Sequence, residues 1–165
     1  MVYSGSMDQH IHHLSCVLEV LENNQLVANR KKCVIGKLEI EYLGHVISHL
    51  GVSADEKKVQ AMLEWPTPRS VKELRGFLGL TGYYRRFVKD YGRLAKPLTE
   101  KIKKNNFSWG EDEEQAFQQL KAKMVDIPVL ALPDFSRPFV VEADASGQGM
   151  GVVLMQDQWP IAYFS

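Results

Sequence analysis

The chain has 165 residues, 45% of them hydrophobic, and a formal net charge of zero at neutral pH. That length can bury one sizeable hydrophobic core or two small ones. Two cysteines, Cys16 and Cys33, are too few for a disulfide framework, and no apolar run approaches the roughly 18 residues of a membrane span. The first residues contain no basic and apolar secretory leader. We therefore expect an intracellular protein of the cytoplasm or nucleus, without a membrane partner.

The first element is a predicted helix from Ser6 to about Glu22. Ser6 is a favourable N-cap, and a helical spacing of leucine and isoleucine gives the helix one apolar stripe. The members of this stripe are Ile11, Leu14, Leu18 and Leu21. We expect the stripe to pack against the rest of the domain.

The same helix raises a metal-site hypothesis, because it carries three histidines and a cysteine. Only His12 and Cys16 share a face at a spacing of four residues, whereas a structural zinc site needs four converging ligands. A solvated polar face is the favoured interpretation.

Strand signals follow the helix. The pattern predicts a hairpin with a first strand at residues 33–35, a turn at Gly36–Lys37 and a second strand at residues 38–42. Residues 42–45 continue it, with Gly44 at a bulge. Ser53 and Glu56 then predict a capping box for a short helix that ends before Pro66.

The most informative stretch is the predicted helix that begins near Val71. Ser70 and Glu73 have the spacing of a capping box, in which each side chain satisfies the other residue's backbone amide. An apolar stripe occupies one side, with members Val71, Leu74, Phe77, Leu78 and Thr81. The opposite side carries cations, glycines and an aromatic, namely Lys72, Arg75, Gly76, Gly79 and Tyr83.

Glycine inside a helix costs roughly 1 kcal/mol relative to alanine, so these glycines call for an explanation. One interpretation is that they open the helix backbone to a polyanion, with Tyr83 beside sugar or base. The other is that they allow close helix packing and that the cations are simply solvated. Charge favours the first, because residues 69–104 contain eleven lysines and arginines and three acidic residues, a net charge of +8. Arg85 and Arg86 extend the basic surface.

Three strands are expected near the C-terminus, at residues 139–144, 149–156 and 161–165, as an antiparallel meander. The first alternates so that Glu142 and Asp144 share one face, which is how a metal site can begin. The glycines at 147–151 lead into a strand and not a helix, which excludes a dinucleotide or P-loop site. We expect one face of this sheet to be uncovered, exposing Val141, Val153, Leu154 and Phe164.

Taken in order, several segments resemble the Pol polyprotein of gypsy-type long-terminal-repeat retrotransposons: YLGHVIS, WPTP, LRGFLGLTGYYRRF, LAKPLTE, PVLALPDF and EADAS. The resemblance covers essentially the whole chain. It implies an α+β fold, with the end of a reverse-transcriptase palm at 1–68, a basic helical thumb at 69–104, and a connection helix with the first strands of an RNase H-like domain at 105–165. The polar stretch at 103–106 is the expected linker.

The resemblance also implies site residues. Primer-grip-like residues are Tyr42, Leu43, Gly44 and His45, and the nucleic-acid-binding residues are Lys72, Arg75, Gly76, Gly79, Tyr83, Arg85 and Arg86. Asp144 corresponds to the first of four carboxylates that hold Mg²⁺ or Mn²⁺ in the family's RNase H site.

We expect a polymerase and RNase H fragment that binds RNA–DNA or DNA duplex. Neither catalytic centre is complete, because the sequence lacks the polymerase Tyr-x-Asp-Asp turn and Asp144 has no partner acids. No functional cofactor is expected in this chain alone. One alternative is a subunit of an active RNA-directed DNA polymerase and ribonuclease H, completed by another part of Pol or by a second copy. The other is a domesticated protein-interaction module.

Overall fold

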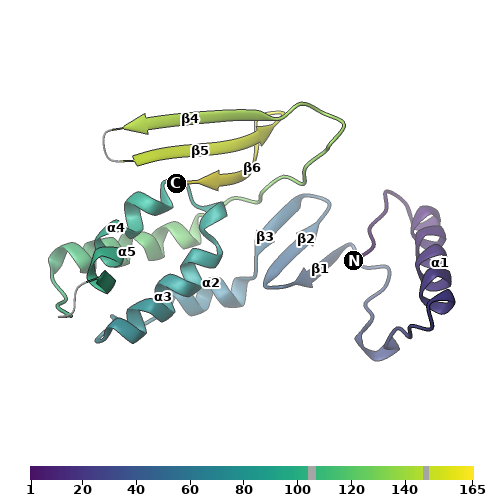
Figure 1. The fold of residues 1–165 in the computed structure, drawn as a ribbon, viewed down its shortest axis with the longest axis horizontal. Helices are drawn as coiled ribbons and strands as arrows, with labels where there is room; N and C mark the ends of the chain where they lie inside the picture. Colours follow the sequence, from purple (N-terminus) through teal and green to yellow (C-terminus); the bar gives the residue numbers. More distant parts are fainter. Residues whose placement is uncertain (104–106, 147–148) are drawn as a thin grey trace. The chain divides into compact units, whose positions relative to one another are not determined.

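The computed structural model describes residues 1–103, 107–146 and 149–165 (Figure 1). The chain divides into two compact units, Met1–Ile40 and Glu41–Ser165. Helices and antiparallel sheets are both present, which confirms the predicted α+β class. No helix in the described part is long and apolar enough to cross a membrane. Parts of the predicted linker and of the predicted glycine turn, at 104–106 and 147–148, lie outside the described residues.

The first unit contains helix α1 (Met7–Asn23) and the short helix η1 (Arg30–Lys32). The predicted cap is confirmed, since the Ser6 side chain accepts from the Gln9 amide. The prediction that the apolar stripe of this helix packs into a core is wrong. Helix α1 contains no buried residue, and Ile11 and Leu18 are more than half exposed. Within the described residues, no group of three or more histidine, cysteine or acidic side chains could hold a metal ion.

The hairpin is present, but its turn is not at the predicted place. Its strands are β1 (Glu39–Tyr42) and β2 (His45–Ser48), joined by a two-residue turn at Leu43–Gly44, and β3 (Gly51–Ala54) completes a sheet of order β1-β2-β3. The predicted strand at residues 33–35 is wrong. Its side chains are exposed, so they have no buried face that would favour pairing.

Helix α2 (Glu56–Leu63) follows β3 and is capped by Asp55, whose side chain accepts from the Lys57 amide. The predicted cap, Ser53, is wrong, because this residue pairs with Val46 inside the β2–β3 ladder. Because Ser53 is paired within the sheet, it cannot also be the residue that caps the start of α2.

The predicted central helix is α3 (Val71–Tyr83), and η2 (Arg85–Phe87) follows it. Ser70 accepts from the Glu73 amide at 3.2 Å, as predicted. The reciprocal half of the capping box differs, because the Glu73 carboxylate accepts from the Arg69 amide at 2.7 Å and not from that of Ser70.

Helices α4 (Tyr91–Lys103) and α5 (Glu111–Val125) pack against α3 and α2 around one hydrophobic core. From the predicted apolar stripe of α3, Leu74, Phe77 and Thr81 are fully buried. The Phe77 and Phe117 rings lie 4.6 Å apart between centroids, so aromatic packing joins α3 to α5. This burial fixes which side of α3 remains at the surface.

The expected C-terminal meander is confirmed as β4 (Val140–Ser146), β5 (Gly149–Gln156) and β6 (Trp159–Phe164), in the order β4-β5-β6. The segment before β4 joins this sheet to the first one. Leu130 and Val52 exchange two backbone hydrogen bonds of 2.8 Å, and the Ala131 amide donates to the Pro160 carbonyl at 2.8 Å. The connection therefore pairs with β3 on one side and β6 on the other.

At Gly51, the pairing between β3 and the segment before β4 leaves no room for a side chain. Its φ is +133°, and a Cβ atom would overlap the Leu130 carbonyl oxygen. We predict that Gly51→Ala lowers the free energy of unfolding by about 1 to 3 kcal/mol, measured by urea denaturation.

Gly79→Ala is the matched control for this substitution, because a Cβ atom at Gly79 meets nothing within 4 Å. It should raise the free energy of unfolding by up to about 1 kcal/mol through helix propensity. Equal stability of Gly51→Ala and the parent chain would contradict the close pairing of β3 with the segment around Leu130.

Candidate nucleic-acid interface

The turn at Leu43–Gly44 is held by two tyrosines from the end of α3. The Tyr83 hydroxyl donates to the Leu43 carbonyl at 2.5 Å, and the Tyr84 hydroxyl donates to the Gly44 carbonyl at 2.6 Å. Both turn residues have positive φ, +50° at Leu43 and +76° at Gly44, as a tight two-residue hairpin turn requires. Leucine is rarely found in this conformation, so the two hydroxyl groups stabilise a turn that its own sequence disfavours.

Tyr84 is the buried member of this pair, and its surroundings explain both its position and its chemistry. Burial, together with the nearby Asp55 carboxylate, raises the pKa of Tyr84 to about 12. The phenol therefore stays protonated and remains a hydrogen-bond donor. A Cβ atom at Gly44 would lie 2.9 Å from this hydroxyl, so only glycine fits beneath it.

His45 lies between the hairpin and the end of α3. Its ring centroid is 5.2 Å from that of Tyr83, 5.5 Å from Tyr84 and 5.6 Å from Phe87. Its Nδ1 is 3.1 Å from the Leu43 carbonyl oxygen, which can only accept, so Nδ1 carries the proton of the neutral ring. Its Nε2 is buried and has no hydrogen-bond partner among the described residues.

The pKa of His45 is lowered, first by burial and then by the positive charge of Arg86. The ring is therefore neutral at neutral pH. A second proton would sit on the buried Nε2, close to a cation and without an acceptor.

The three glycines of α3 have different surroundings. A Cβ atom at Gly76 would lie 3.2 Å from the Trp65 ring, and one at Gly82 would lie 3.5 Å from the Tyr91 hydroxyl. At Gly79, a Cβ atom would meet nothing within 4 Å. The packing interpretation therefore accounts for Gly76, whereas Gly82 has room for a small side chain in ordinary contact and Gly79 opens the helix backbone to solvent.

The predicted cations lie on the exposed side of α3 and on η2. Lys72, Arg75, Arg85 and Arg86 are all exposed, and Tyr83 is 50% exposed. Within the described ranges, none of these four cations forms an ion pair with a carboxylate. Their positive charges are thus available to an anionic ligand.

The structure brings most of the sequence-predicted residues together. The Tyr83 bond to Leu43 places the hairpin turn at the C-terminal end of the α3 surface. We call this combined area the turn–helix surface; it comprises residues 42–45 with Lys72, Arg75, Gly79 and Tyr83. Tyr84 was missed by sequence reasoning. A buried tyrosine needs an acceptor for its hydroxyl, but the acceptor lies 40 residues away in the chain.

Asp144 lies apart from the turn–helix surface, on β4. It shares one sheet face with Glu142, and both line a cavity of about 170 Å³ together with Lys89, Asp90 and Tyr163. Lys89 brings a positive charge to this cavity, and the described residues supply no group of three or more metal-binding side chains. The donors present do not fit an Mg²⁺ or Mn²⁺ site.

Comparison with known proteins gives three kinds of similarity. Residues 109–165 match the family described as "RNase H-like domain found in reverse transcriptase". The chain is 55% identical over 132 residues to the uncharacterized mitochondrial protein AtMg00860 of Arabidopsis thaliana, covering 79% of this chain and 84% of that protein.

It is also 38% identical over 167 residues to the retrovirus-related Pol polyprotein from transposon 297, and 35% identical over 178 residues to that from transposon gypsy, both of Drosophila melanogaster. These matches cover the whole of this chain, which spans 16% and 17% of the polyproteins.

Two solved structures share the fold. The foamy viral protease-reverse transcriptase dRH in complex with double-stranded DNA superposes with a TM-score of 0.89 over 98% of this chain and 30% of that chain. The foamy viral protease-reverse transcriptase in complex with an RNA/DNA hybrid gives 0.86 over 98% of this chain and 23% of that chain. Sequence identity is 24% in both cases, so the likeness shows the fold alone.

The environment of His45 predicts a pH dependence of stability. In the unfolded chain, His45 takes up a proton near its ordinary pKa of 6.5. In the folded chain its pKa is lowered, so it takes up the proton only at lower pH. The contribution of His45 is therefore fully present above 6.5 and is lost as pH falls from that value towards the lower folded pKa.

We predict that His45→Asn removes this part of the pH dependence, measured by urea denaturation at a series of pH values. His49→Asn, at an exposed histidine, is the control and should follow the parent curve. Parallel curves for the parent and His45→Asn would show that the partly buried His45 ring does not resist protonation.

Proposed function

Because the chain belongs to the family of retrotransposon Pol-related proteins that includes the transposon 297 and gypsy polyproteins, we propose that it binds nucleic acid duplex of the template–primer kind. The substrate class is RNA–DNA or DNA duplex, bound without regard to sequence. The observation that carries the proposal is the turn–helix surface, where an open helix backbone, unpaired cations and a braced hairpin turn adjoin.

The geometry of the turn–helix surface fits the groove of a nucleic acid duplex better than a flat protein partner. A duplex backbone can approach α3 at Gly79, where no side chain intervenes, while Lys72 and Arg75 lie on the same helix face for phosphate contacts. Tyr83 is half exposed at the end of this face and offers a ring to sugar or base. The solved structures with this fold contain double-stranded DNA and RNA/DNA hybrid, which supports a duplex as the ligand.

In this proposal the chain corresponds to a gypsy-type Pol segment. Residues 1–68 correspond to the end of the palm, 69–104 to the thumb, and 105–165 to the connection helix and the first RNase H-like strands. Residues 42–45 are the primer-grip-like part of the surface. Gly76 faces the Trp65 ring, which lies in the segment after α2, so in this proposal its role is packing and not open backbone.

Catalysis is not part of the proposed function of this chain alone. Asp144 corresponds to one carboxylate of the family's RNase H centre, where Mg²⁺ or Mn²⁺ would activate water. The donors around Asp144 do not complete such a centre among the described residues. Activity of a larger polypeptide that contains this segment is compatible with the proposal.

The salt dependence of binding should depend on Arg75 of the turn–helix surface and on Arg85 and Arg86 of the adjoining helix η2. Each phosphate contact contributes about 0.9 to the slope of log affinity against log salt concentration. Replacing Arg75, Arg85 and Arg86 together with alanine should reduce the slope by roughly 2 to 3, measured by fluorescence anisotropy with labelled DNA duplex and RNA–DNA hybrid.

The triple alanine variant of Arg30, Lys31 and Lys32 is the matched control, because it removes the same charge from the other compact unit. Its slope should equal that of the parent. Gly79→Leu should weaken binding without lowering the free energy of unfolding, since it fills an open surface. Unchanged affinity of Gly79→Leu, or equal slopes for both triple variants, would contradict duplex binding at this surface.

A further inference from the structure

The C-terminal sheet has two faces of different chemical character. Strand pairing aligns side chains in rows across the three strands: Val141 with Leu154 and Ala162, and Ala143 with Val152 and Phe164. Ala145 and Met150 form a third, shorter row. These eight residues define the outer apolar face, which contains no polar or charged side chain.

The opposite face differs in both composition and contacts. It carries Glu142 and Asp144, and its Tyr163 packs against the hydrophobic core of the unit. Figure 1 shows β6 as the strand next to the helices and β4 as the far edge of the sheet. The outer apolar face thus points away from the core.

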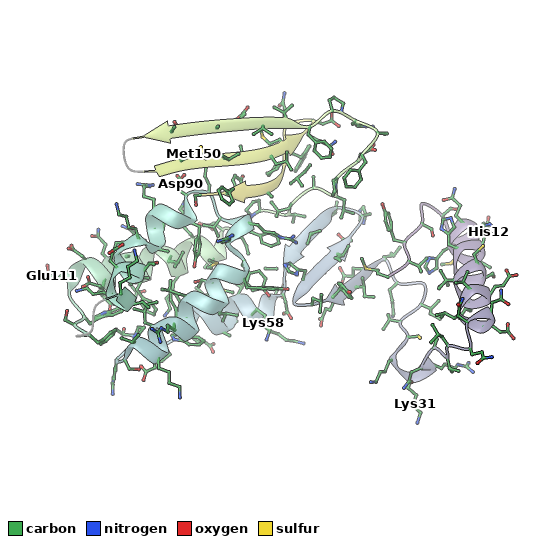
Figure 2. The ribbon with its side chains drawn as sticks, viewed as in Figure 1. His12, Lys31, Lys58, Asp90, Glu111 and Met150 are labelled. Carbon is green, nitrogen blue, oxygen red and sulfur yellow. The ribbon has the colours of Figure 1, made fainter. Side chains whose placement is uncertain are left out.

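The outer apolar face is substantially exposed. The exposed fractions are 62% for Val141, 54% for Met150 and 60% for Phe164, and Met150 is labelled on β5 in Figure 2. The sequence predicts an uncovered face with Val141, Leu154 and Phe164; the structure confirms Val141 and Phe164 as exposed, and Leu154 lies on the same face but is partly buried. Val153 was wrongly included, because the register places it opposite Glu142 on the face towards the core.

We propose that this face binds the same face of a second copy of the chain in a two-fold symmetric dimer. An uncharged surface meets its own copy without like-charge repulsion. Nucleic acid is a poor occupant, because the face offers no cation to a phosphate.

The distribution of large and small side chains makes the face complementary to itself. A two-fold axis parallel to β5 places β4 of one copy over β6 of the other. Each row of side chains then lies over the same row of the second copy, with the strands in the opposite order. Phe164 then lies over Ala143 of the second copy, and Val141 lies over Ala162. Bulky residues meet alanines at both edges, and Leu154 and Val152 meet their own equivalents near the axis. Stacked sheets of this kind pack about 10 Å apart.

The dimensions of the face set the strength of the dimer. Eight residues of β5 extend about 26 Å, and three strands span about 14 Å. Two such faces bury on the order of 700 Å² in total, which is small and corresponds to a weak, transient interface. We therefore expect reversible association with a Kd on the order of tens of micromolar.

Sedimentation velocity of the full chain, over concentrations from about 2 to about 200 µM, tests the proposal. Val141→Glu places a charge on the outer apolar face and should raise the Kd at least about tenfold. Val140→Glu is the matched control: it makes the same change at the neighbouring residue, 49% exposed, on the opposite face, and should change the Kd less than about twofold.

Both positions are exposed, so we expect both variants to keep the parent's secondary structure. Circular dichroism checks this. High salt should leave the dimer intact, in contrast to duplex binding. A parent chain that is monomeric at every concentration, or equal weakening by the two substitutions, would overturn the proposal.

Discussion

The hydrogen bonds from Tyr83 and Tyr84 to the Leu43–Gly44 turn are the interaction on which the turn–helix surface depends. They join two segments 40 residues apart in the chain and stabilise a backbone conformation that leucine rarely adopts. His45 fills the space between them as a neutral ring, because burial and Arg86 lower its pKa. Without these contacts, the hairpin tip and the open side of α3 would be two separate features.

The rest of the second unit holds both partners of this contact in place. Leu74 and Phe77 bury one side of α3 against α5, which leaves Gly79 and Arg75 at the surface. On the hairpin side, β3 is tied to the connection segment through Val52 and Leu130. The surface therefore rests on regular elements anchored by the hydrophobic core, which suits a binding site that must keep its shape.

The sequence predicted those parts of the fold that local chemistry specifies. The start of α3 followed from Ser70, its buried side from a helical spacing of apolar residues, and the C-terminal meander from alternation around Glu142 and Asp144. The hairpin turn was misplaced, because Gly36–Lys37 carries a stronger turn signal than Leu43–Gly44, whose conformation depends on distant tyrosines.

The candidate site was predicted as a set of residues but not as an arrangement. Helical spacing put Arg75, Gly79 and Tyr83 on one face, and the structure agrees. Spacing could not reveal that Gly76 contacts Trp65, nor that the Tyr84 hydroxyl reaches the hairpin, because both depend on tertiary packing.

Amide hydrogen exchange with and without a DNA duplex shows whether the turn and the helix bind as one surface, because it reports on the hairpin and the helix in one measurement. If the turn and the helix form one surface, duplex addition slows exchange both in residues 42–45 and along α3 from Lys72 to Tyr83, with little change in the outer strand β4. Slower exchange confined to one of the two segments, or to the C-terminal sheet, would contradict a single surface formed by the turn and the helix.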